Sequence, residues 1–90
     1  MRDYKYLAFI RKLCCCDCGS FRCVEAAHFG AHGMGQKASD LDALPLCLRC
    51  HRTGPKSYHT LGARRFRDVH ELDVEGLQKQ CREGYRRIAA

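Results

Sequence analysis

Residues 44–52 read LPLCLRCHR, and Cys47, Cys50 and His51 within them form a C-x-x-C-H pattern. Taken alone, this pattern allows covalent haem attachment, a redox dithiol, or two thiolate ligands of a zinc ion. The stretch CCDCG contains a second pair with the same spacing, Cys15 and Cys18. Two such pairs provide the four soft ligands that a tetrahedral structural zinc ion takes, so the sequence favours zinc.

Haem and disulfides explain the cysteines less well. The first residues, MRDYKYLAFIRKLCC, contain only a broken apolar stretch and no small-residue cleavage site, so we expect no signal peptide. No window approaches the roughly 18 consecutive apolar residues of a membrane span. We therefore expect a soluble, cytoplasmic protein whose thiols stay reduced. A haem would leave the second C-x-x-C pair unexplained, and the glycine-rich region lacks the βαβ context of a thioredoxin-like dithiol.

The chain has eight cysteines in 90 residues, twice as many as one zinc ion needs. A domain this small buries little apolar surface and usually needs a metal or disulfides to fold. Cys14 flanks the first pair and is its nearest rival as a ligand. Cys16, Cys23 and Cys81 are expected to be small buried hydrophobes. The predicted structural zinc ligands are Cys15, Cys18, Cys47 and Cys50.

Basic residues are in excess along the whole chain. Sixteen Lys and Arg against ten Asp and Glu give a formal net charge of +6, spread over segments such as RDYKY, IRK, ARRFR and CREGYRR. This balance favours a polyanionic partner, and nucleic acid above all. The alternative is an ordinary solvated surface.

The apolar pattern predicts one small α+β domain with no repeat and no linker. A helix is expected over residues 4–13, followed by a loop-rich core with short strands in EAAHF and ASDLDALPL. Pro55 suits the first position of a further helix, which would carry apolar residues at 58, 61, 66, 69 and 72. Asp73 is the expected N-cap of a last helix over 73–88, with an apolar stripe at Leu77, Cys81, Tyr85 and Ile88.

Histidines provide candidates for a second site, since a zinc ion closed by four sulfurs has no open position for chemistry. The 28 residues between Cys18 and Cys47 contain His28 on the first predicted strand. His51 and His59 would be about 12 Å apart on one continuous helix. The Gly54-Pro55 break could fold the chain so that the two histidines meet. The alternative is that His59 caps or packs its own helix.

The run CCDCG…EAAHFGAHGMGQKASDLDALPLCLRCHRTGPKSYH resembles the HNH endonucleases of the ββα-metal fold, especially phage-associated members with a four-cysteine zinc. The resemblance covers about residues 11–66, with flanking helices on either side. It implies a divalent cation and hydrolysis of nucleic-acid phosphodiesters. By this resemblance His28 is the general base, His51 binds the catalytic metal, and His59 is the following ligand.

The sequence departs from the family pattern at two places. Ala27 stands where many members have a metal ligand, and Asp42 stands in the slot of the middle asparagine. Asp40 lies two residues earlier, and we expect it to complete the metal site. A hard oxygen ligand there suits Mg²⁺ or Mn²⁺. Alternatively, one aspartate only fixes the hairpin through backbone hydrogen bonds.

Together these observations predict a metal-dependent endonuclease, a hydrolase that nicks DNA as a monomer or weak dimer, with RNA as a second possible substrate and no membrane partner. The competing hypothesis is a non-catalytic, zinc-stabilised nucleic-acid-binding module. Ala27 and the missing asparagine favour this second hypothesis.

Overall fold

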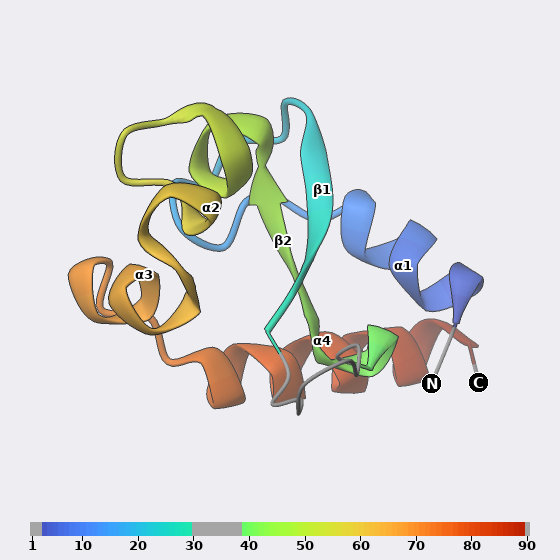
Figure 1. The fold of residues 1–90 in the computed structure, drawn as a ribbon. Helices are drawn as coiled ribbons and strands as arrows, with labels where there is room; N and C mark the ends of the chain where they lie inside the picture. Colours follow the sequence, from blue (N-terminus) through green and yellow to red (C-terminus); the bar gives the residue numbers. More distant parts are fainter. Residues whose placement is uncertain (1–2, 30–38, 90) are drawn as a thin grey trace.

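A two-stranded antiparallel hairpin stands at the centre of the fold, with helices on both sides and below it (Figure 1). The computed structural model describes residues 3–29 and 39–89. The expected small α+β class is confirmed. In chain order the elements are α1 (Tyr4–Arg11), β1 (Val24–His28), the 3₁₀ turn η1 (Asp40–Asp42), β2 (Ala43–Cys47), the π-helical turn η2 (Arg49–Thr53), α2 (Tyr58–Leu61), α3 (Ala63–Val69) and α4 (Val74–Ala89).

The register of the hairpin places its two ends in different surroundings. Val24 pairs with Cys47 at the end that carries the second cysteine pair, and His28 pairs with Ala43 at the other end. All five residues of β2 are buried, whereas β1 begins with three half-buried residues and ends in the buried Ala27 and the exposed His28. A strand that is buried on both faces reads as a continuous apolar run, and ALPLC has that character.

The largest buried side chains form two groups on either side of the hairpin. Phe66 of α3 is fully buried in a cluster with Ala27, Leu46 and the cysteines 15 and 47. Tyr6 of α1 is also fully buried, and its ring meets that of Tyr85 of α4 edge to face at 5.1 Å. The first helix therefore packs against the last one.

Helix α1 is two residues shorter than the predicted span of 4–13. The Asp3 side chain caps it by accepting a hydrogen bond from the amide of Tyr6. The helix ends at Arg11. The amide of Lys12 still donates to the carbonyl of Phe9, and the amide of Leu13 donates to the carbonyl of Ile10. The chain then turns into the first cysteine pair.

The single helix predicted from Pro55 onward is wrong, because the segment forms two helices. The chain enters α2 only after Ser57, whose hydroxyl accepts from the amide of Thr60. Gly62 then separates α2 from α3 with a φ of 85°, a backbone conformation that favours glycine. The expected apolar positions are thus divided between two helices.

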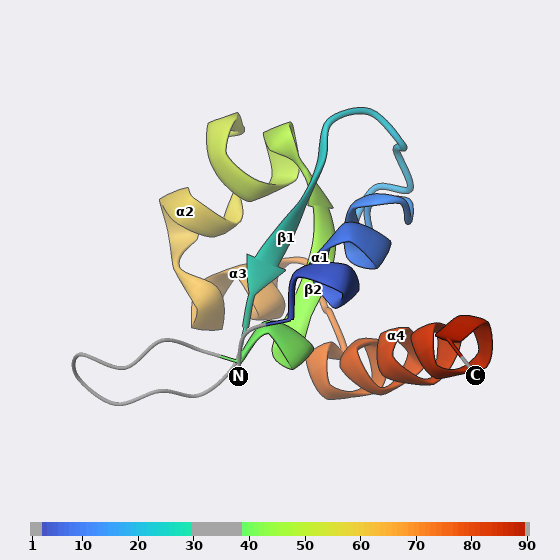
Figure 2. The same cartoon turned by 90° about the vertical axis from the view of Figure 1, so that its right-hand side faces the viewer.

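Helix α4 runs below the hairpin in Figure 1 and lies to its lower right in Figure 2, and side chains of the helix bond back to the hairpin. Asp73 accepts from the amide of Gly76, which confirms the predicted N-cap. The side-chain amide of Gln78 donates to the carbonyl of Asp42, and the guanidinium of Arg82 donates to the carbonyl of Leu41. These two bonds hold η1 against the helix. The predicted apolar stripe is half-buried except at its end, where Ile88 is 73% exposed.

No helix within residues 3–29 and 39–89 is long and apolar enough to cross a bilayer. All eight cysteines of the chain are present as free thiols. Disulfides therefore do not hold this fold together.

Candidate functional site

The four predicted cysteine ligands come together at one end of the hairpin. The sulfur atoms of Cys15, Cys18, Cys47 and Cys50 all lie within 4.8 Å of one another, a group that could hold a metal ion such as zinc. Gly19 makes the first turn tight, with a φ of 83° and an amide that donates to the carbonyl of Cys15. This turn directs both sulfurs of the first pair toward the second, as tetrahedral coordination requires.

One thiol of the cluster is held in its protonated form until a metal displaces the proton. Burial raises the pKa of the Cys50 thiol, and its hydrogen bonds with Cys47 and with the accepting carboxylate of Asp17 add to the rise. Metal binding to thiols releases protons, so the affinity of the cluster should increase with pH.

The other four cysteines lie outside the cluster. Burial raises the pKa of Cys16 to about 12 and also raises that of Cys81, which agrees with their expected role as small hydrophobes. Cys23 is different, because it is exposed and has a φ of 52°. The prediction that Cys23 is buried is therefore wrong.

A π-helical turn connects the second cysteine pair to the histidines. The turn η2 contains both Cys50 and His51, and the amide of Gly54 closes it by donating to the carbonyl of Arg49 at 2.8 Å. A side chain at position 54 would meet that carbonyl at 2.8 Å, so only glycine fits there. Single π turns of this kind occur often at functional sites.

His51 and His59 face each other as the sequence predicted. Their Nε2 atoms are 3.2 Å apart, and the imidazole of His51 is 5% exposed. The break after Gly54 lets α2 fold back over η2, which brings the two rings together. The two Nε2 atoms therefore lie at hydrogen-bonding distance from each other.

Glu25 was not predicted as a site residue, yet it fixes the orientation of His51. Its Oε1 accepts from His51 Nδ1 at 2.7 Å and from Arg52 Nε at 3.0 Å. With the proton of His51 held on Nδ1, the lone pair of Nε2 points toward His59. A carboxylate behind a metal-binding histidine is the usual way in which proteins fix the tautomer and ring orientation.

The charges of this group agree with that arrangement. Although burial acts to raise it, the hydrogen bonds from His51 and Arg52 lower the pKa of Glu25, which is therefore ionised at neutral pH. Burial lowers the pKa of His51 and, together with the smaller effects of His59 and Arg52, outweighs the opposing effect of Glu25. His51 is therefore neutral at pH 7, the form of histidine that binds metal ions.

His28 and Asp40 form a second pair at the other end of β1. His28 Nε2 lies 2.7 Å from Oδ1 of Asp40, whose second oxygen accepts from the amide of Asp3. Asp40 is 3% exposed, while the imidazole of His28 is 38% exposed. Asp40 thus contacts His28 and the start of α1.

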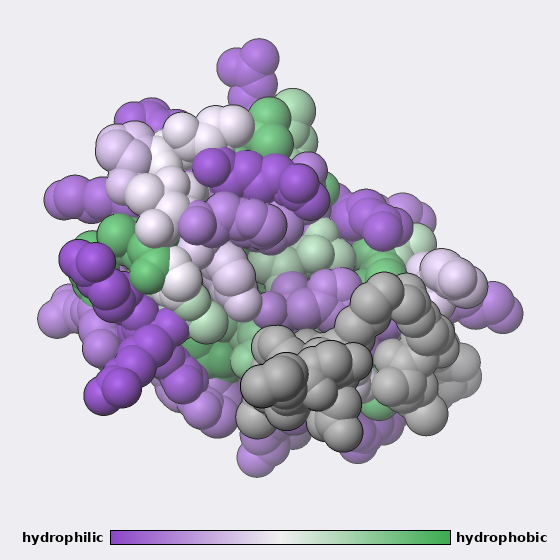
Figure 3. Space-filling view, in the orientation of Figure 1, coloured by the Kyte–Doolittle hydropathy of each residue, from purple (hydrophilic) through white to green (hydrophobic). Residues whose placement is uncertain are grey.

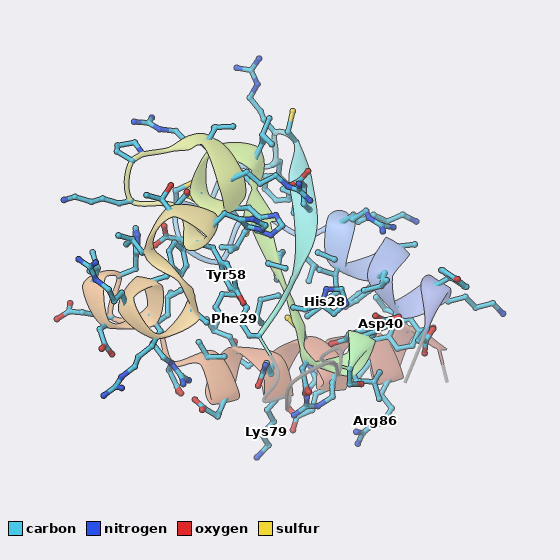
Figure 4. The ribbon with its side chains drawn as sticks, viewed as in Figure 1. His28, Phe29, Asp40, Tyr58, Lys79 and Arg86 are labelled. Carbon is cyan, nitrogen blue, oxygen red and sulfur yellow. The ribbon has the colours of Figure 1, made fainter. Side chains whose placement is uncertain are left out.

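The two pairs project from opposite faces of β1. Side chains alternate along a strand, so Glu25 and Ala27 share one face and His28 lies on the other. Figure 4 shows His28 and Asp40 together on the α1 side of the hairpin, whereas Tyr58 lies on the α2 side. Three residues of strand separate Glu25 from His28 by about 10 Å. The structure therefore brings His51 to His59 and His28 to Asp40, and it keeps Asp40 apart from the His51–His59 pair.

Comparison with known families gives one match. Residues 1–64 match the model of a family described as "protein of unknown function (DUF968)". The chain belongs to the DUF968 family. No curated protein and no solved structure matches the chain. The DUF968 match includes the four-cysteine cluster, the His51–His59 pair and the His28–Asp40 pair. Most of α3 and all of α4 follow the matched residues.

Tyr58 connects the two histidine pairs within the part of the chain that the DUF968 match covers. Its hydroxyl donates to the backbone carbonyl of His28 at 2.7 Å. Its ring lies edge to face against Phe29, with centroids 4.4 Å apart, and against His51 at 5.8 Å. The end of β1 and the start of α2 are therefore held together.

Two further residues of this DUF968 protein have structural roles. Asp42 pairs with Arg82, and its carbonyl accepts from Gln78, so Asp42 joins the hairpin to α4. His70, which follows α3, bonds to Asp17 through Nδ1 and to the carbonyl of Lys56 through Nε2. Nothing in the sequence around His70 indicated these contacts. His32, a neighbour of the predicted site, lies outside the described residues.

Proposed function

We propose that this protein is a metal-dependent endonuclease of the HNH type that hydrolyses nucleic-acid phosphodiesters. The observation that carries the proposal is the His51–His59 pair, with Nε2 atoms 3.2 Å apart and Glu25 behind one ring. The order of hairpin followed by helical turn also resembles the ββα-metal core. The basic charge of +6 favours the same substrate class.

His51 and His59 are the residues that would hold the catalytic ion. When bound, a divalent ion would polarise a phosphate oxygen and stabilise the charge of the transition state. Two imidazole nitrogens suit borderline ions such as Ni²⁺ or Zn²⁺, whereas Mg²⁺ and Mn²⁺ prefer oxygen ligands. Because Asp40 contacts His28, the described residues contribute imidazoles and no carboxylate oxygen to this pair. We therefore propose a borderline ion ahead of Mg²⁺ or Mn²⁺.

His28 is the proposed general base. Asp40 accepts from Nε2 of His28, which leaves Nδ1 of this exposed ring able to accept a proton from water. The water oxygen then forms a bond to phosphorus as the bond to the leaving oxygen breaks, and its proton moves to Nδ1. A buried carboxylate that fixes the tautomer of a catalytic histidine is a recurring arrangement.

Substrate would pass over the outer edge of β1 to reach both groups. Within the described residues β1 pairs only with β2, so its outer edge carries no strand. A nucleic-acid backbone that crosses this edge meets the His51–His59 pair on one face and His28 on the other.

A zinc-stabilised nucleic-acid-binding module without turnover is the second candidate. The observation in its favour is Ala27, which is fully buried on the face of β1 where the family places a further metal ligand. Binding would then persist although no divalent ion supported cleavage.

Incubation with supercoiled plasmid separates the two candidates. We expect wild-type protein to convert supercoiled to open-circular DNA only when Ni²⁺, Zn²⁺, Mn²⁺ or Mg²⁺ is added. A single site cuts one strand at a time, so open circles should precede linear DNA. Failure with every ion in this panel, by protein that still contains its zinc and binds the plasmid, would reject the endonuclease and favour the module.

Glu25→Gln should weaken the catalytic ion while leaving the four-cysteine cluster intact. The amide oxygen can still accept from His51 Nδ1 and Arg52 Nε, but without the negative charge it holds the Nδ1 proton more weakly and makes the ring of His51 a weaker metal ligand. Loss of such a partner typically costs about 10- to 100-fold in metal affinity or activity. The measurement is the concentration of added ion that gives half-maximal nicking.

Glu75→Gln is the matched control for this substitution. Glu75 also pairs with an arginine, Arg67, but on the exposed surface of α4. It should leave the metal dependence unchanged. An identical metal titration for wild type and Glu25→Gln would remove Glu25 from the site.

A further inference from the structure

Two large apolar side chains are exposed on neighbouring segments at the cysteine end of the hairpin. Phe21 is 73% exposed and Leu48 is 39% exposed. The amide of Leu48 donates to the carbonyl of Cys23 at 2.9 Å, so the loop before β1 and the turn after β2 lie side by side. Single exposed apolar residues are common and need no explanation. Two on adjoining loops form a small apolar platform.

Hydrogen bonds hold the loop that presents Phe21. The carbonyl of Ser20 accepts from the amide of Cys15, and the hydroxyl of Ser20 accepts from the amide of Arg22. Cys23 then takes a φ of 52° and turns the chain into β1. The loop is thus fixed to the first cysteine pair, and the exposed ring needs little ordering when it binds a partner.

A cation follows each of the two platform residues in the chain. Arg22 and Arg49 are exposed, and neither has an ion-pair partner within residues 3–29 and 39–89. Arg49 also lines a cavity of about 400 Å³ with the exposed Lys56. The nearby carboxylates are already paired, Glu25 with His51 and Arg52, and Asp17 with His70. Figure 3 shows apolar surface beside strongly hydrophilic side chains where β1 begins and β2 ends.

We propose that Phe21 and Leu48 form a stacking platform for an unpaired base of a nucleic-acid strand, whose phosphates contact Arg22, Arg49 and Lys56. An aromatic face among cations is the arrangement with which proteins bind single strands without reading their sequence. The platform lies four residues before Glu25 in the chain, at the same end of β1 as the His51–His59 pair. This inference extends the proposed function, because it places the bound strand next to the proposed metal site.

The test measures binding of a single-stranded oligonucleotide that contains 2-aminopurine, with no divalent ion added. Loss of one base–aromatic contact should weaken binding by about 5- to 150-fold in Phe21→Ala. Phe21→Trp should retain affinity and quench the 2-aminopurine fluorescence. Tyr4→Ala is the matched control, since Tyr4 is 77% exposed on α1 and should have no effect. Arg22→Ala should lower the slope of log affinity against log salt by about 0.7.

Three outcomes would overturn the platform. Binding by Phe21→Ala equal to wild type would do so, and so would an equal loss in Tyr4→Ala. A loss of zinc rather than of affinity in Arg49→Ala would mean that this cation neutralises the thiolates. Because no cleavage is measured, the platform and the endonuclease are tested separately. Base stacking without any nicking would support the platform and reject the proposed activity.

Discussion

Cys47→Ser should prevent the chain from folding at neutral pH. Cys47 is buried at the end of β2, and its sulfur lies 3.6 Å from that of Cys18 in the four-cysteine cluster. Structural zinc contributes about 10–16 kcal/mol of apparent binding free energy in small zinc domains. The whole folding free energy of a small domain is about 5–15 kcal/mol. Loss of one ligand, and of the zinc with it, therefore removes more free energy than the folded state gains over the unfolded chain.

The measurements are zinc content per chain and the thermal unfolding transition followed by circular dichroism. We expect Cys47→Ser to lose both its zinc and its cooperative transition, and chelation of wild-type zinc to have the same result. Cys23→Ser is the matched control, because Cys23 is exposed and outside the cluster. If Cys47→Ser keeps one zinc per chain and unfolds like wild type, the cluster is not a structural metal site.

His28→Ala should reduce the nicking rate by about 10²- to 10⁴-fold, the usual contribution of a positioned general base. The four-cysteine cluster lies at the other end of the hairpin, so zinc content should be unchanged, whereas thermal stability should fall because the buried Asp40 loses a partner. Initial rates on supercoiled plasmid at saturating metal check the first expectation, and the unfolding transition checks the second.

Added imidazole distinguishes a lost base from a lost structural contact. A small base that diffuses into the cavity left by His28→Ala should restore part of the rate, whereas it cannot restore packing. Equal nicking by wild type and His28→Ala would remove His28 from the mechanism. The metal dependence of wild-type nicking would still support the endonuclease.

The cysteine cluster and the hairpin could be predicted because their signals are local. A C-x-x-C pair places two sulfurs on one tight turn, whatever the rest of the chain does. Two such pairs must meet if they share an ion, and the segment between them then forms the hairpin. The meeting of His51 and His59 was predicted in the same way, from the break at Gly54.

The placement of Asp40 could not be read from the sequence. The family resemblance led us to expect Asp40 at the catalytic ion, but in the structure it contacts His28, and its second oxygen accepts from the amide of Asp3. That second contact joins residues 37 positions apart, and no local pattern specifies it. The carboxylate that does contact His51 is Glu25. Residues two apart on a strand share a face, so Glu25 could have been expected on the same face of β1 as Ala27, the position of the family's metal ligand.

Helix boundaries depended on backbone preferences that apolar spacing does not reveal. The residues at 58, 61, 66 and 69 fit one helical pattern, yet Gly62 takes a φ of 85° between two short helices. The N-cap at Asp73 was predicted correctly, because its side chain bonds within its own turn.

The π turn η2 contains both Cys50 and His51, so the four-cysteine cluster and the His51–His59 pair depend on the same turn. An oxidant that joins the thiols would release the metal and unwind η2, and the histidine next in sequence would leave its partner in α2. The chain would then fail as an unfolded, inactive polypeptide rather than persist as a folded protein with a damaged site. Under oxidative stress a cell would have to degrade the unfolded chain, but it would not have to inhibit a folded and damaged protein.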